Sequence, residues 1–113
     1  MVKPSEFTSK LLFKDWKLGT NEDEFTVMRL RSLRTVAGDQ IETVQTLFDR
    51  FDRESGVSSM SRTTGYTCTA GAGLILNGLF NERGCFPPEI IGMKDNCFDF
   101  VIDHLSKRNI ILT

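Results

Sequence analysis

Residues 56–84, GVSSMSRTTGYTCTAGAGLILNGLFNERG, decide the fold of this 113-residue chain. With Ser58 or Ser59 as the N-cap, small and apolar residues recur at spacings of three and four, as on one face of a helix. Gly84 stands where a left-handed residue would end such a helix, and two prolines follow it. The pattern predicts one continuous helix over residues 58–82.

The glycines within this segment raise the question of a dinucleotide-binding loop. A G-x-G-x-x-G fingerprint would need a third glycine where Leu76 stands, and a buried strand ahead of it. The residues before Gly71 are instead small and polar. We therefore expect Gly71 and Gly73 to lie inside the helix, where each costs about 1 kcal/mol relative to alanine. Close packing against a neighbouring helix is favoured over a bound ligand as their purpose.

Two segments rich in β-branched and apolar residues precede the helix. EFTVMRLRSLRTV, residues 24–36, and QIETVQTLFDRFD, residues 40–52, flank a Gly-Asp turn signal. Together they predict an antiparallel hairpin around residues 37–40. Apolar residues occur on both faces of this hairpin, so we expect both faces to be covered.

The two ends of the chain predict shorter elements. Residues 5–13 can form an amphipathic helix capped by Ser5, and residues 85–92 are expected to be an extended, proline-set connection. Asp95 or Asn96 can cap a last helix, which carries apolar residues at spacings of three and four.

Asn109 can end this last helix, and residues 110–112 would form a terminal strand. The predicted class is α+β, with an antiparallel β-hairpin that is part of a mixed sheet. The hairpin would pack with one long and one shorter helix.

Composition excludes several classes of protein. Fourteen basic and fifteen acidic residues leave a net charge of −1 without blocks of like charge, so no nucleic-acid partner is expected. No apolar run approaches a membrane span and the first residues do not resemble a signal peptide, so we expect no membrane partner and a cytoplasmic location. The three cysteines lack C-x-x-C spacing, which argues against a disulfide framework or a zinc site.

Candidate catalytic or metal-binding groups are few. Cys97 and His104 are two helical turns apart, too far for a nucleophile and its base, so no catalytic residue is assigned. Asp49, Asp52 and Glu54 alternate with arginines in FDRFDRESG. Solvated ion pairs are expected there instead of a metal site, because hard cations need several convergent oxygens.

The stretch SSMSRTTGYT, residues 58–67, places seven hydroxyl groups around one arginine at the start of the predicted long helix. Free backbone N–H groups and the helix dipole make such a position suitable for an anion or a polar ligand. Alternatively, the hydroxyls only cap the helix and bond to backbone carbonyls. Residue chemistry alone favours the second interpretation.

The order of several segments resembles one known family. FTSKLLFKDWKL, FTVMRL, SSMSRTTGYTCTA, GCFPPEIIG and FDFVIDHLSKRNI follow one another as in the C-terminal region of saccharopine dehydrogenase, of the glutamate-forming saccharopine reductase type. The resemblance extends over nearly the whole chain. It implies that residues 1–113 form a single C-terminal segment, without a Rossmann domain, of a two-domain α/β oxidoreductase of lysine metabolism.

The resemblance also implies partners and a site. Enzymes of this family use NADP or NAD, held by an N-terminal domain, so this chain is expected to bind no cofactor and to be inactive alone. Partners would be an upstream nucleotide-binding domain or a further copy in a homo-oligomer such as a dimer. The resemblance places the SSMSRTTG segment near the junction of the two domains. With this placement, a ligand site at the helix start and simple capping by the hydroxyls are equally favoured. The residues expected to contact a substrate carboxylate or cofactor phosphate are Ser59, Arg62, Thr63 and Thr64.

Two alternatives remain open. The chain could be a non-enzymatic module that associates with itself through exposed strand edges. It could also be the corresponding part of a carboxynorspermidine-type dehydrogenase, because the residues that select the substrate lie outside the matched segments. Whether the chain takes part in an enzyme is therefore not decided by its sequence.

Overall fold

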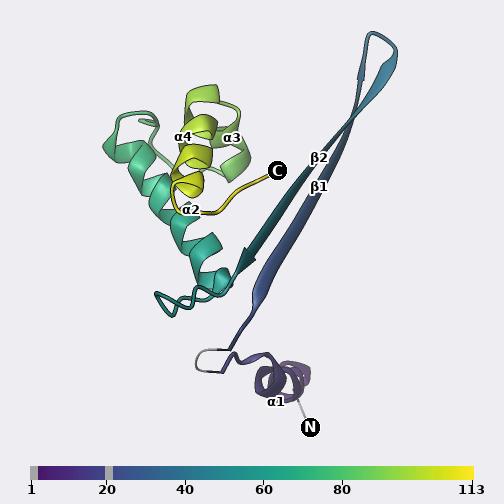
Figure 1. The fold of residues 1–113 in the computed structure, drawn as a ribbon, viewed down its shortest axis with the longest axis vertical. Helices are drawn as coiled ribbons and strands as arrows, with labels where there is room; N and C mark the ends of the chain where they lie inside the picture. Colours follow the sequence, from purple (N-terminus) through teal and green to yellow (C-terminus); the bar gives the residue numbers. More distant parts are fainter. Residues whose placement is uncertain (1–2, 20–21) are drawn as a thin grey trace.

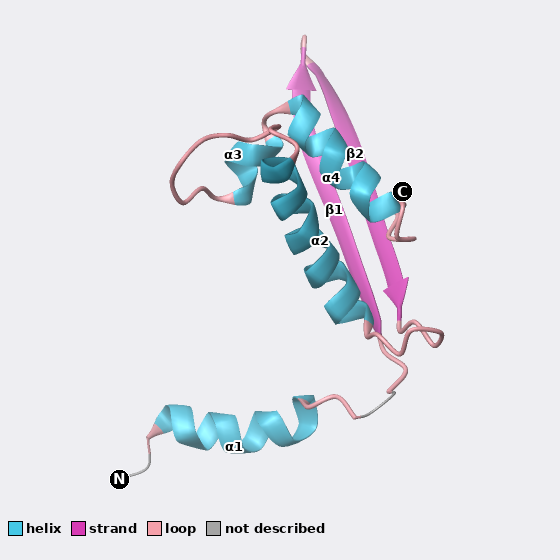
Figure 2. Cartoon of the chain, turned by 90° about the vertical axis from the view of Figure 1, so that its left-hand side faces the viewer, coloured by secondary structure: helices cyan, strands magenta, loops and turns pink. Residues whose placement is uncertain are grey.

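The computed structural model describes residues 3–19 and 22–113, which form four helices and a two-stranded sheet (Figure 1). In chain order the elements are α1 Pro4–Trp16, β1 Phe25–Val36, β2 Asp39–Arg50, α2 Ser59–Leu76, α3 Pro88–Gly92 and α4 Asp95–Ser106. The helices α2 and α4 pack near the open end of the hairpin, and its turn projects away from them (Figure 1). The helix α1 lies beyond the open end (Figure 2). This arrangement confirms the predicted α+β class, with a hairpin, one long helix and one shorter helix.

The hairpin forms where the sequence predicts it. β1 and β2 pair antiparallel over their full lengths, with Val36 opposite Asp39 next to the turn. The connection consists of Ala37 and Gly38, whose φ angles are 53° and 96°. Positive φ at both central residues is the requirement of a type I′ turn, which matches the twist of the strands it joins.

The described part of the chain covers only the open end of one face of the hairpin. Leu47 and Asp49 of β2 point toward the helices, and each is 6% exposed. On the other face, Phe25, Val27 and Phe48 are more than half exposed, although the Phe25 and Phe48 rings contact each other at 5.8 Å between centroids. The prediction that both faces are covered was therefore wrong for most of the hairpin, because only its open end packs against the rest of the described chain.

The helix α2 is shorter than the helix predicted over residues 58–82. It ends at Leu76 because Gly78 adopts a left-handed φ of 68° and the Leu79 N–H bonds back to the Leu74 carbonyl at 2.9 Å. A glycine in this conformation commonly ends a helix. The prediction that Gly84 ends the helix was wrong, since Gly84 lies in the loop that follows.

The two interior glycines of α2 have different surroundings. A Cβ on Gly73 would come within 2.9 Å of the Phe100 ring on α4, whereas one on Gly71 would meet nothing within 4 Å. The prediction of close helix packing is therefore confirmed for Gly73. For Gly71 it was wrong, because that residue borders an open apolar groove.

The loop after α2 contains a helix that the sequence did not predict. Residues 85–92 were expected to be extended, but Pro88–Gly92 form the short helix α3. Pro88 favours this outcome, because its fixed φ suits the first helical position and its missing N–H is not needed there.

The helix α4 and the end of the chain largely follow the prediction. The predicted cap at Asp95 or Asn96 was wrong, because the helix already begins at Asp95 and its N-cap is Lys94, without a side-chain bond. Asn109 has a left-handed φ of 59° after the helix, as expected of a residue that ends it. The predicted terminal strand is reduced to a single bridge between Leu112 and Leu47.

Two small clusters of buried side chains hold the hairpin and helices together. One joins the hairpin to the end of the chain, and the other joins α2, α4 and the loop between them. Val101 of α4 packs against both clusters, so they form one continuous core. The buried members are Leu47, Leu105 and Ile110 in the first cluster and Leu74, Phe80 and Cys97 in the second.

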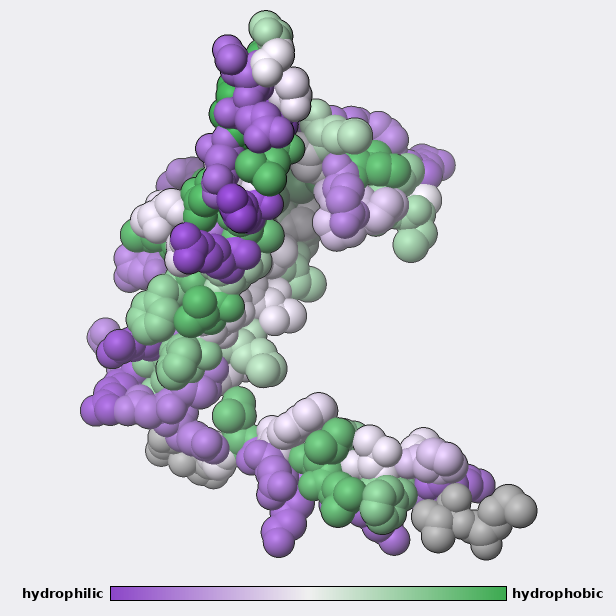
Figure 3. Space-filling model, turned by 90° about the vertical axis from the view of Figure 1, so that its right-hand side faces the viewer, coloured by the Kyte–Doolittle hydropathy of each residue, from purple (hydrophilic) through white to green (hydrophobic). Residues whose placement is uncertain are grey.

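The helix α1 lies apart from this core. Among the described residues it contacts no other helix or strand, and its surface carries apolar patches that face solvent (Figure 3). The predicted cap at Ser5 was wrong: the N-cap is Lys3, without a side-chain bond, and Pro4 is the first helical residue. Nothing in the described chain therefore fixes the apolar side chains of α1.

Candidate functional site

The start of α2 is stabilised by side chains of this chain itself. Ser58 is the N-cap, and its Oγ accepts a hydrogen bond of 3.1 Å from the Ser61 N–H. The Ser59 N–H donates to the carboxylate of Glu24, which precedes β1. Backbone donors that could bind an anion at a free helix end are thus already partly engaged.

Several of the clustered hydroxyls bond back to the helix. The Thr63 hydroxyl donates to the Ser59 carbonyl at 2.9 Å, and the Thr67 hydroxyl donates to the Thr63 carbonyl at 2.7 Å. These bonds are the capping and backbone contacts of the alternative interpretation. Ser59 differs, because its hydroxyl is fully buried and has no hydrogen-bond partner in the described chain.

Arg62 connects three parts of the fold. Its Nε and Nη2 lie 3.3 and 3.4 Å from the two carboxylate oxygens of Asp49 on β2, and its Nη1 lies 3.2 Å from Asp52. Nη2 also donates to the Arg108 carbonyl after α4 at 3.0 Å. The side chains of Arg62 and Asp49 are only 10% and 6% exposed, so the two charges compensate each other inside the protein.

Tyr66 lies one turn further along α2, between two cationic side chains. The guanidinium carbons of Arg62 and Arg108 lie 5.8 and 5.5 Å from the centre of its ring. Both distances are within the range of a cation–π contact. The ring therefore helps to keep both arginines beside the Arg62 hydrogen-bond network.

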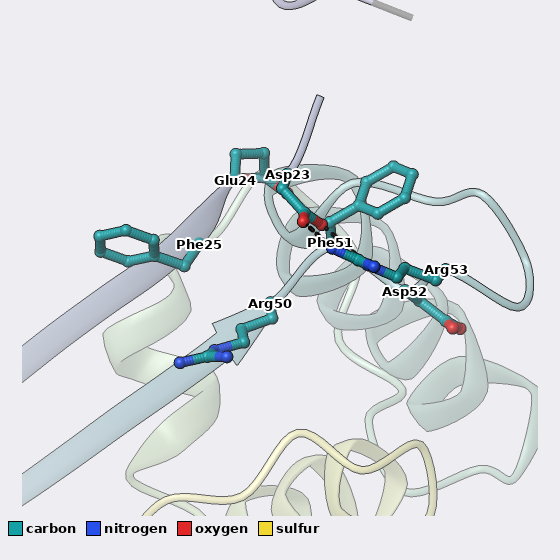
Figure 4. Close-up of a pocket in the computed structure, with 7 residues that line it drawn as sticks. All are labelled: Asp23, Glu24, Phe25, Arg50, Phe51, Asp52 and Arg53. Atoms are coloured by element: carbon teal, nitrogen blue, oxygen red, sulfur yellow. Dashed lines mark hydrogen bonds and ion pairs between the residues drawn. The ribbon is translucent and has the colours of Figure 1, made fainter. Parts of the chain in front are cut away.

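A cavity of about 490 Å³, lined by charged residues and two phenylalanines, lies beside this network, where the hairpin strands end. Figure 4 shows its seven lining residues, with Asp23 and Arg53 turned toward each other in an ion pair. The hydrogen bond from Arg53 lowers the pKa of Asp23, and this pairing raises the pKa of Arg53. Arg50 lies on the Phe48 ring, 5.0 Å from its centre.

Asp52 lies between this cavity and Arg62. The Ser55 hydroxyl and the Glu54 N–H donate to its carboxylate at 2.7 and 3.0 Å. Together with Arg62 they lower the pKa of Asp52, the Ser55 bond contributing most. The region therefore remains charged at neutral pH, with carboxylates and guanidinium groups close to one another.

The four residues predicted to contact a ligand do not converge. Ser59 and Arg62 point into the protein, Thr63 is half-buried and Thr64 is exposed. A second cavity of about 470 Å³ lies at the helix start, and its described lining includes Ser58 and Ser61 but none of these four residues. Their role as ligand contacts remains a prediction.

The sequence also misjudged the acidic residues before α2. Solvated ion pairs were expected for Asp49, Asp52 and Glu54, but Asp49 is buried and bound to Arg62. The strand period places Asp49 on the same face as Leu47, toward the helices. This alternation along the strand, together with an arginine on the following helix, could have indicated that Asp49 is buried in an ion pair.

Cys97 and His104 each have another partner. The Cys97 thiol is buried and donates to the Leu79 carbonyl at 3.5 Å, while His104 Nε2 lies 3.0 Å from the Thr69 hydroxyl. Burial lowers the pKa of His104, and the nearby charge of Arg108 lowers it further. The two side chains therefore contribute to the contact of α4 with α2 and the following loop.

Within residues 3–19 and 22–113, no three potential metal ligands come together. None of the helices in these ranges is long and apolar enough to cross a membrane.

Comparison with protein families identifies the group to which the chain is similar. The family model described as saccharopine dehydrogenase C-terminal domain matches residues 1–111. No solved structure matches the chain.

Proposed function

Because the chain belongs to the saccharopine dehydrogenase C-terminal domain family, we propose that it supplies part of the substrate domain of an NAD(P)-dependent oxidoreductase of lysine metabolism. The match over residues 1–111 is the observation that carries this proposal. The reaction would be hydride transfer between saccharopine and NADP or NAD, with the cofactor held by an upstream nucleotide-binding domain.

The region around the start of α2 is the candidate substrate contact. Two separate features are candidates: the exposed Thr64 hydroxyl on α2, and the charged cavity at the end of the hairpin, which Arg50 and Arg53 line. Guanidinium groups suit the carboxylates of an amino-acid substrate. Arg62 would act mainly by fixing the position of α2, because it is already bound to Asp49 and Asp52.

The chain alone should neither bind the cofactor nor turn over substrate. A titration with NADPH, followed by nicotinamide fluorescence, should show no saturable binding to the isolated chain. Joined to an upstream nucleotide-binding domain, the same chain should support NADPH formation from saccharopine. Turnover by the isolated chain, or none by the joined protein, would contradict the proposal.

The role of the α2 start can be tested in the joined protein. Thr64→Val should raise KM for saccharopine because it removes an exposed hydroxyl near the predicted contacts. Thr67→Val is the matched control, since the Thr67 hydroxyl already bonds the Thr63 carbonyl. Equal kinetic constants for the two variants would show that Thr64 does not contact the substrate.

A further inference from the structure

The sequence contains one Asn-Gly dipeptide, Asn77–Gly78, and it lies where α2 ends. An asparagine side chain loses ammonia most readily before glycine, because the backbone nitrogen that attacks its amide carbon then belongs to a residue without a side chain. Both residues are exposed, so water reaches them. The dipeptide is therefore a candidate site of spontaneous chemical modification.

The fold holds this dipeptide in a conformation that does not react. The five-membered ring of the intermediate requires the Gly78 nitrogen to lie beside Asn77 Cγ. At the Asn77 ψ of 3°, that nitrogen eclipses the backbone nitrogen of Asn77 instead of its Cβ. The Gly78 N–H also donates to the Ile75 carbonyl at 3.0 Å, and Asn77 Nδ2 donates to the Gly73 carbonyl at 2.8 Å. These two bonds must break before the ring can close.

The last turn of α2 is the part of the helix that opens most readily. Ile75 and Leu76 are 65% and 86% exposed, so little packing holds them. Leu74 and Phe80, on either side of the turn, are buried and can keep their places in the core. Exposed ends of elements open at much lower free energy than the core does. An opening confined to residues 75–78 would free both the Gly78 N–H and the ψ angle before it.

We propose that Asn77 is a site of spontaneous deamidation, and that opening of the last turn of α2 controls its rate. The Gly78 nitrogen loses its proton to a solvent base and attacks Asn77 Cγ. Once the N–Cγ bond has formed, the Cγ–Nδ2 bond breaks and Nδ2 leaves as ammonia with a proton from water. Water then opens the resulting succinimide at either carbonyl, giving aspartate or isoaspartate. This inference concerns the chain alone and does not depend on the proposed reaction.

Both products would weaken the end of α2. They place a carboxylate at the helix C-terminus, where the dipole disfavours negative charge, and they lack the Nδ2 donor to the Gly73 carbonyl. Isoaspartate also adds a methylene group to the backbone shortly before Leu79, whose carbonyl accepts a hydrogen bond from the buried Cys97 thiol. The isoaspartate form should therefore loosen the contact between α4 and the loop after α2.

Incubation of the full chain at mildly alkaline pH, with and without denaturant, tests the proposal. Peptide mass spectrometry should find an acid in place of the amide at Asn77 in both samples, formed several-fold more slowly in the native chain. Asn81 is the internal control. It is also exposed and donates a similar bond, to the Gly78 carbonyl at 2.8 Å, but it precedes Glu82, so it should stay unmodified over the same period.

Three outcomes of this incubation would contradict the proposal. Equal rates at Asn77 with and without denaturant would show that the fold does not control the reaction. Conversion of Asn81 as fast as Asn77 would show that the Asn-Gly dipeptide is not a special site. An intact Asn77 in the native chain, when the unfolded chain is fully converted, would exclude modification of the folded protein.

Leu76→Gly tests the role of the last turn. It removes almost no packed atoms, because Leu76 is largely exposed, but glycine is a poor helix former. Relative to the same variant in denaturant, deamidation of the native chain and hydrogen exchange of the Gly78 N–H should both become faster by a similar factor. Met60→Gly, near the start of α2, is the matched control and should change neither rate. Faster exchange without faster deamidation would exclude control by this opening.

The effect on the core can be measured on the modified chain, which ion exchange separates by its added negative charge. The isoaspartate form should react faster at Cys97 with a thiol reagent than the unmodified chain does. Asn77→Gln keeps an amide and should show neither the charge change nor the faster reaction after the same incubation. An isoaspartate form with unchanged Cys97 reactivity would overturn the proposed effect on the core.

Discussion

Gly73 of α2 lies directly against the ring of Phe100 on α4, so that a Cβ on Gly73 would be 2.9 Å from Phe100 Cζ. This close approach fixes the separation of the two helices. Alanine is usually favoured over glycine in a helix by about 1 kcal/mol. Gly73→Ala should show no such stabilisation, because overlap of its Cβ with the Phe100 ring would cost at least as much. Urea unfolding should show a free energy of unfolding equal to or below that of the parent chain.

Gly71→Ala is the matched control for this substitution. Its Cβ would enter open space, so the free energy of unfolding should rise by about 0.5–1 kcal/mol. Equal effects of the two alanines would show that Phe100 does not restrict α2.

The buried pair of Arg62 and Asp49 should dominate the charge contributions to stability. Arg62→Met should lower the free energy of unfolding by about 3–5 kcal/mol, because it leaves the Asp49 carboxylate buried without compensation. Arg53→Met removes the exposed pair with Asp23 and should cost less than about 1 kcal/mol. Chemical denaturation of both variants provides the measurement. Adding Asp49→Leu to Arg62→Met should recover part of the loss.

His104 should make stability depend on pH in the mildly acidic range. Its pKa in the folded chain is lowered from the usual 6.5, first by burial and then by Arg108, while Asp103 acts in the opposite direction. The unfolded chain consequently binds more protons below that pH. Stability should be fully present above pH 6.5 and should fall as the pH decreases toward the folded-state pKa.

Thermal denaturation between about pH 5 and 8 tests this expectation, because the range extends about one unit or more on either side of the ordinary histidine pKa. His104→Asn keeps a polar side chain near the Thr69 hydroxyl but cannot take up a proton. The variant should lack the decrease near pH 6. A decrease of the same size in both proteins would assign it to other groups.

The turn of the hairpin can be improved. Ala37 has a φ of 53°, a conformation that asparagine tolerates better than alanine. Ala37→Asn should stabilise the outer end of the hairpin by about 0.5–1 kcal/mol. Slower amide hydrogen exchange of the paired residues next to the turn is the measurement, and Gly38→Ala should have the opposite effect.

The elements of the fold were predictable where the signal is local. The turn at residues 37–40 and the helix over Asp95–Ser106 follow from short patterns of turn and apolar residues. The end of α2 was not predictable, because Gly78 and Gly84 could each be the left-handed glycine that ends a helix. Only the return of the chain, which buries Phe80 beside Leu74, selects the first.

The site was less predictable than the fold. The sequence identified the hydroxyl-rich start of α2, but it could not show that Arg62 would be bound by Asp49 across 13 positions. Such a pair depends on how α2 lies against the hairpin. For the same reason the sequence did not separate Ser59, which is buried, from Thr64, which is exposed.

Cys97 is completely buried, while Cys68 and Cys85 are exposed. The three thiols should therefore react with a thiol reagent at different rates. A thiol reagent should label two cysteines at once and the third only when α4 separates from the loop after α2. The rate of that last step would report how often this part of the core opens in the native protein, without any engineered probe.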